Sequence, residues 1–216
     1  MNARLALIWI ERGLLALAAA LAIWCGIVLI EARRTNAIPI PPPQTQTPGA
    51  GAIQPGSAPA DPRRPRAPVE AGTWVARLDA PTVRLSATVL EGTADATLNR
   101  GAGHIEDTPF PGEPGNIGVA GHRDTIFRPV RNLRIGDPLV LTDQGHVYRY
   151  RITKTSIVNP EDVYVLDPAD HPTLTLVTCY PFEFIGHAPR RFIVRADLVT
   201  AEARVEPAGT AGRAAR

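Results

Sequence analysis

Three kinds of side chain in the C-terminal half of this 216-residue chain could do covalent chemistry together. Cys179 ends the alternating segment TLVTC and is followed by Tyr180-Pro181, which must leave a regular strand. His122 ends a second such segment, NIGVAGH, and Arg190 and Arg191 open a third, 11 and 12 residues after the cysteine. A thiol, an imidazole and a guanidinium can supply a nucleophile, a proton carrier and a fixed positive charge.

Other kinds of chemistry find little support. The only other cysteine, Cys25, lies in an apolar run, so no disulfide framework and no cysteine pair for zinc is expected. None of the five histidines forms an H-x-H or H-E-x-x-H pair, and we predict neither a metal site nor a cofactor. By itself, a single cysteine is more often a buried structural residue than a nucleophile.

The N-terminal residues 1–37 are predicted to be a short stub and a transmembrane anchor. Leu14 to Ile30 is a run of 17 uncharged, mostly apolar residues, near the minimum that spans a bilayer. The alternative is a cleaved signal peptide, but Glu-Ala-Arg-Arg follows the run instead of a small-residue cleavage site. Two arginines lie on each side of the run, so charge alone leaves its orientation open.

Residues 38–70 are predicted to be an extended tether, because ten of the 22 prolines lie between Pro39 and Pro68. The small, polar residues 201–216 are expected to form a disordered tail. The net charge of +2 and the lack of a long basic run argue against a nucleic-acid partner.

Residues 71–200 should form the folded domain. Its segments alternate with period two, are rich in β-branched residues and are separated by turn residues, as in PGEPG and DQG. Short helices are expected only near 95–100 and 127–133. Seven or eight short strands in this length predict a mainly β domain, either a barrel or a sandwich.

The segments TLVTCYPFEFIGHAPRRFIVRA and GNIGVAGHRDTIF resemble the cysteine and histidine strands of the sortases, and CYPF and GHAPRRFIV are most similar to class D sortases. The resemblance covers nearly all of 71–200. It implies a closed β-barrel of seven to eight strands with short helices. It also implies Cys179 as nucleophile, His122 as proton carrier, Arg191 (a better match than Arg190) as the catalytic arginine, and Thr178 as a residue that shapes the substrate pocket.

The resemblance further implies a membrane-anchored cysteine transpeptidase whose catalytic domain lies outside the cytoplasmic membrane. It thereby makes the N-terminal stub of 1–37 cytoplasmic and the tether of 38–70 extracytoplasmic. Sortases cleave a C-terminal LPxTG-like sorting signal after Thr and transfer the acyl group to an amine, either of cell-wall peptide or of a pilin lysine. Asp61-Pro62 resembles the lid motif of pilin-polymerising enzymes but lies in proline-rich spacer. An L,D-transpeptidase is excluded because its cysteine follows an S-H-G motif, whereas Cys179 follows Thr178. A catalytically idle sortase-like scaffold is the alternative.

Overall fold

The structure, a computed structural model, describes residues 3–36, 69–183 and 186–204. The chain divides into two units, Met1–Ile38 and Pro39–Arg216, which are described separately. Most of the predicted tether (up to residue 68) and the tail from residue 205 lie outside the described residues.

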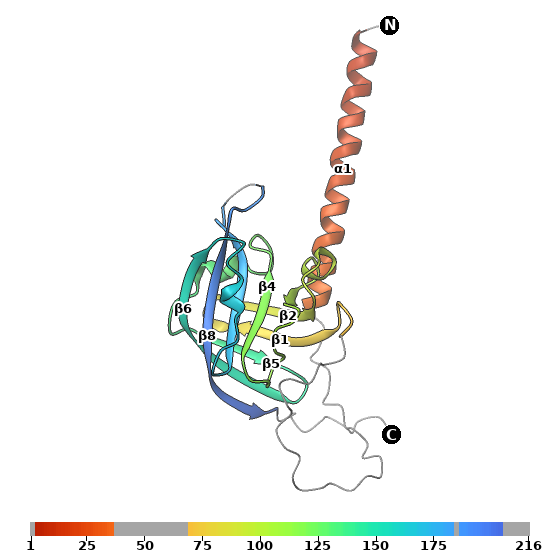
Figure 1. Cartoon of the computed structure of the whole chain (residues 1–216). Coiled ribbons are helices and arrows are strands. Elements are labelled where there is room, and N and C mark those ends of the chain that lie inside the picture. Colours follow the sequence, from red (N-terminus) through yellow and green to blue (C-terminus); the bar gives the residue numbers. More distant parts are fainter. Residues whose placement is uncertain (1–2, 37–68, 184–185, 205–216) are drawn as a thin grey trace, which may run out of the picture. The chain divides into compact units, whose positions relative to one another are not determined.

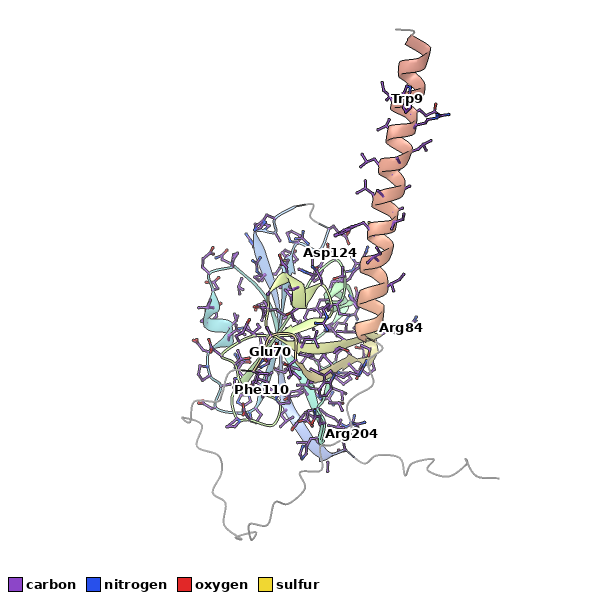
Figure 2. The ribbon with its side chains drawn as sticks, turned by 90° about the vertical axis from the view of Figure 1, so that its right-hand side faces the viewer. Trp9, Glu70, Arg84, Phe110, Asp124 and Arg204 are labelled. Carbon is purple, nitrogen blue, oxygen red and sulfur yellow. The ribbon has the colours of Figure 1, made fainter. Side chains whose placement is uncertain are left out.

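The first unit is a single helix, α1 (Ala3–Asn36). Within it, the 19 residues Trp9–Ile27 are long and apolar enough to cross a membrane. At 1.5 Å per residue this stretch extends about 28 Å, close to the thickness of a bilayer's hydrocarbon core. Trp9 and the other described apolar side chains of this stretch project away from the helix axis (Figure 2) and are not packed in a protein core.

The second unit is a closed eight-stranded barrel with the strand order β1-β2-β3-β4-β7-β8-β6-β5 (Figure 1). The expected barrel is therefore confirmed. Its strands are β1 (Trp74–Ala80), β2 (Leu85–Glu91), β3 (Ala102–His104), β4 (Asn116–Gly121), β5 (Pro138–Thr142), β6 (His146–Val158), β7 (Thr173–Tyr180) and β8 (Arg190–Ala203). Most pairs are antiparallel, but β4 and β7 run parallel at the centre of the site described below.

Side chains alternate between the inner and outer faces of the barrel. In β6, Tyr148, Tyr150 and Ile152 are buried while Arg149 and Arg151 between them are exposed, so one face lines the core and the other meets water. In β4 and β7 most residues are buried, on both faces, and none is exposed. The outer face of these two strands must therefore be covered by other parts of the chain.

Short helices connect the strands. The expected helical segments are present as α2 (Asp95–Leu98) and η2 (Arg128–Asn132), and the 3₁₀ helices η1 (Pro81–Val83) and η3 (Val163–Leu166) add two more turns. Strand β8 runs to Ala203, past the expected domain end at residue 200, because its last residues still pair with the start of β6. Asp124, just after β4, and Arg204, just after β8, lie at opposite ends of the barrel (Figure 2).

Candidate active site

Strand register brings Cys179 and Arg191 together. Strands β7 and β8 are antiparallel, and Cys179 lies directly opposite Arg191. Directly opposed residues project from the same face of a sheet, with Cβ atoms about 4.5–5.5 Å apart. Arg190 lies opposite Tyr180 instead, so its side chain points to the other face. The register therefore favours Arg191 over Arg190 as the partner of the thiol.

His122 reaches the same edge of the sheet from a different strand. Strands β4 and β7 are parallel, with Gly121 beside Thr178. The residues that follow this pair, His122 and Cys179, therefore lie side by side, because the two chain segments run in the same direction. Both side chains, like that of Arg191, are half-buried. The structure thus gathers at one end of the barrel the three residues expected to be catalytic.

The backbone around His122 is fixed by packing and hydrogen bonds. A Cβ atom on Gly121 would lie 2.6 Å from the ring of Phe127, so only glycine lets this fully buried ring pack there. The Phe127 N–H donates to the His122 carbonyl over 3.0 Å. The short segment after β4 is therefore folded back on itself, which holds the imidazole at the strand end.

Thr178 is bonded to the histidine strand. It is only 3% exposed and lies on the interior face of β7, opposite Phe192. Its hydroxyl donates to the Gly121 carbonyl over 2.7 Å. This bond links the end of the cysteine strand to the end of the histidine strand.

The β7–β8 turn is linked to the segment after His122. The Arg123 guanidinium donates to the Gly186 carbonyl over 2.9 Å, and Arg131 of η2 forms an ion pair with Glu183. Arg191 is oriented from within the turn, because its Nη1 donates to the carbonyls of Ala188 (3.3 Å) and Arg190 (3.1 Å). These bonds use one nitrogen of a group with five N–H donors.

A strip of small and apolar residues leads away from the cysteine along the outer face of the barrel. Ala120 lies opposite Val177, which in turn lies opposite Ile193. Val177 lies two residues before Cys179 on β7, so both project from the same face. Farther along β4, Gly118 is covered by the side chains of Ile105 and Leu166, each 3.0 Å from where its Cβ would be. Nothing in the sequence marks this apolar strip, because its members resemble ordinary strand residues.

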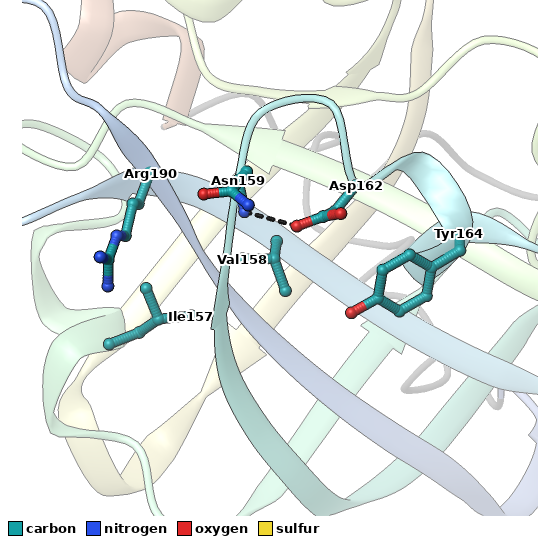
Figure 3. A pocket seen from close by; sticks show the side chains of 6 residues that line it. All are labelled: Ile157, Val158, Asn159, Asp162, Tyr164 and Arg190. Atoms are coloured by element: carbon teal, nitrogen blue, oxygen red, sulfur yellow. Dashed lines mark hydrogen bonds between the residues drawn. The ribbon is translucent and has the colours of Figure 1, made fainter.

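A hollow of about 280 Å³ opens beside this end of the barrel (Figure 3). It is lined by Ile157, Val158, Asn159, Asp162, Tyr164 and Arg190. The Asn159 N–H donates to the Asp162 carboxylate over 2.7 Å and shapes its rim. The hollow contains none of the three expected catalytic side chains, but Val158 in its lining lies opposite Arg191 on the neighbouring strand.

The other histidines lie elsewhere. His104 on β3 is 1% exposed, and its Nδ1 lies 2.7 Å from the Glu91 carboxylate. His171 pairs with Asp197 over 3.1 Å at the surface, and His146 and His187 are exposed. Within residues 3–36, 69–183 and 186–204, no group of three His, Cys, Asp or Glu side chains is placed to hold a metal ion.

Comparison with known proteins identifies the family. Residues 78–199, more than half of the chain, match the sortase domain model. The chain is 37% identical over 132 residues to Sortase D of Bacillus subtilis, covering 61% of this chain and 67% of that protein. It is 28% identical to Sortase A of Bacillus anthracis, covering 60% of this chain and 62% of that one. The chain thus spans about two thirds of the length of these two relatives.

Solved structures agree. The Sortase D5 transpeptidase of Clostridium perfringens is similar with a TM-score of 0.56 at 30% identity, covering 62% of this chain and 83% of that one. Sortase E1 of Streptomyces coelicolor, solved with a tripeptide in its active site, is similar with a TM-score of 0.57 at 29% identity, covering 65% and 96%. The chain belongs to the sortase family of transpeptidase enzymes, which confirms the resemblance seen in its motifs.

Proposed function

We propose that this protein is a membrane-anchored cysteine transpeptidase that cleaves an LPxTG-like sorting signal after Thr and transfers the acyl group to an amine. The observation that carries the proposal is the strand register that gathers Cys179, His122 and Arg191 at one edge of the barrel. The three residues come from three separated segments of the chain, and a shared catalytic role accounts for their meeting at one place. Their half-burial leaves them accessible to a peptide.

The first half of the reaction forms a thioester. The Cys179 sulfur, whose thiol proton passes to His122, attacks the carbonyl carbon of the signal's Thr, and the carbonyl electrons move to oxygen. When this tetrahedral species collapses, the bond to the next residue breaks and His122 donates a proton to the leaving amine. Arg191, whose charge is permanent, donates hydrogen bonds to the developing oxyanion or to the peptide's carbonyls.

The second half reverses these roles. An acceptor amine attacks the thioester carbon while His122 accepts one of its protons. The C–S bond then breaks to leave the new amide, and His122 returns the proton to the Cys179 sulfur, which restores the thiol. The acceptor in this proposal is an amine of cell-wall peptide or a pilin lysine. Thr178 contributes by holding the β4 and β7 ends together through its bond to Gly121 rather than by touching substrate.

The apolar strip of Ala120, Val177 and Ile193 suits the apolar part of such a signal. An extended peptide whose Thr carbonyl lies at Cys179 would have its preceding residues along this strip, where the half-buried Ala120 and Val177 offer apolar contacts to Leu and Pro. The α1 helix would anchor the enzyme beside its substrates, with the barrel outside the cytoplasmic membrane, and tethering would raise the local concentration of signal.

The proposal is tested with the full-length protein in detergent and a panel of LPxTG-like peptides, with and without peptide amines. We expect cleavage after Thr and an amide product when amine is present. Arg191→Ala should lower the rate about 10²-fold or more, whereas the matched variant Arg190→Ala should stay close to the unsubstituted enzyme. Peptides that bind folded protein with a free thiol but are never cleaved would instead indicate the scaffold alternative.

A further inference from the structure

Asn116, the first residue of β4, is fully buried yet uses both ends of its amide. Its Nδ2 donates to the carbonyls of Val165 (2.9 Å) and Asp167 (3.2 Å). Its Oδ1 accepts from the Thr175 hydroxyl over 2.7 Å. Burying an amide is costly unless it is hydrogen-bonded, so these three bonds are a strong constraint on the segments they join.

The two carbonyls belong to the end of η3, inside the loop that connects β6 to β7. A helix end leaves carbonyls without intrahelical partners, and here the Asn116 side chain supplies the missing donors. A four-residue helix is too short to be stable alone. Its Val163 and Tyr164 are largely exposed, so they add little burial to hold it.

Packing next to Asn116 supports the same attachment. Gly118 follows on the same face of β4, and an added Cβ there would lie 3.0 Å from Leu166 of η3. The next residues on that face are Ala120, in the apolar strip, and then His122. The loop is therefore attached to the face of β4 on which the proposed peptide would lie, and Tyr164 of the same loop lines the neighbouring hollow (Figure 3).

We propose that Asn116 is a positioning residue that fixes the β6–β7 loop against β4 and so preforms the binding surface for the sorting signal. The inference rests on the proposed function, since it concerns the same substrate. Asn116 lies at the start of β4 and Cys179 lies beside its far end, so Asn116 acts on binding and takes no part in bond making or breaking.

The variant Asn116→Asp separates this role from a general one. It keeps the shape and the acceptor for Thr175, but replaces both donors to the loop with a carboxylate oxygen facing two carbonyls. Losing those bonds should raise KM for the signal peptide about tenfold or more while kcat changes less than about threefold. Asn99→Asp makes the same substitution at an exposed position and should change neither constant.

Hydrogen exchange of the full-length protein in detergent supplies a readout independent of activity. In Asn116→Asp we expect faster exchange confined to amides 163–172, with strand β1 unchanged and Cys179 alkylated by iodoacetamide at the original rate. Unchanged exchange in the loop, or an unchanged KM with a reduced kcat, would overturn the proposal.

A second variant covers failure of the first to fold. Leu166→Ala weakens the same attachment from the half-exposed side, without a buried charge, and should also raise KM and loosen 163–172. If the loop exchanges faster in both variants but the enzyme cleaves no signal peptide, Asn116 still fixes the loop and the proposed function is rejected. If the loop stays protected in Leu166→Ala and KM is unchanged, the positioning role of Asn116 is rejected.

Discussion

His104 lies on β3 and His122 directly follows the neighbouring strand β4, yet the surroundings of the two rings differ. His104 is buried, and both its ring nitrogens are used: Nδ1 faces the Glu91 carboxylate at 2.7 Å and Nε2 faces the Pro109 carbonyl at 3.0 Å. His122 is half-buried at the end of its strand, beside the cysteine strand.

The difference shows how this barrel separates framework from site. The fold engages both ring nitrogens of His104: Nδ1 lies against the Glu91 carboxylate, and Nε2 lies against the Pro109 carbonyl and the Thr108 hydroxyl. A histidine that is buried and bonded in this way is out of reach of a bound peptide. His122 keeps its ring at an accessible edge while Phe127 and Gly121 hold its backbone, which is what a proton carrier requires.

The largest effect is expected from His122→Gln. Loss of general acid and base catalysis should reduce kcat for peptide transfer by about 10²-fold or more, because His122 is the group that protonates the leaving amine in our mechanism. The melting temperature should be unchanged, since the side chain contributes little burial. A variant that retains more than a tenth of the rate would remove His122 from the mechanism.

His104→Gln should do the reverse. Removing one partner of a buried, hydrogen-bonded pair costs about 3–5 kcal/mol, so the free energy of unfolding measured in urea should fall by that order. The fraction that stays folded should keep kcat within a few-fold of the original. A variant that is as stable as the original protein but has a strongly reduced kcat would show that His104 acts in catalysis and not in stability.

A smaller effect concerns two framework groups on β6, Tyr148 and Tyr150. Burial and the negative charge of Asp143 raise the pKa of both phenols well above the ordinary 10.0, and Tyr148 also donates to Asp143 over 3.0 Å. A raised folded pKa means that the stabilisation is complete below pH 10 and is lost as the pH rises above it.

We therefore expect the unfolding free energy to decline between pH 10 and pH 11, and Tyr150→Phe to reduce that slope. Tyr164→Phe, at an exposed position, is the matched control and should leave the slope unchanged. An identical alkaline slope in Tyr150→Phe would show that this phenol ionises as freely in the fold as in the unfolded chain.

Much of the fold followed from local pattern. Alternating, β-branched segments between turn residues predicted the strands, and the two short helices appeared where expected. Local pattern could not choose between barrel and sandwich, because closure depends on pairings between distant strands, such as parallel β4 and β7. The motif resemblance made that choice.

For the site, the motifs predicted which residues would act but not which residues they would contact. Whether a residue faces the barrel interior depends on register, which bulges shift in the β6–β8 ladder. Register explains why Thr178 is buried although it precedes the nucleophile. Asn116 carries no signal in the sequence, since an asparagine at a strand start gives no hint of the loop carbonyls it will bind.

The central claim is that Cys179 becomes acylated by a sorting signal. The most direct measurement is the intact mass of the full-length protein mixed with an LPxTG-like peptide and trapped by acid. We predict an added mass equal to the peptide up to its Thr, located on Cys179, absent in Cys179→Ala and discharged by an amine as an amide. Cleaved peptide without an adduct, or with the adduct on another residue, would contradict it.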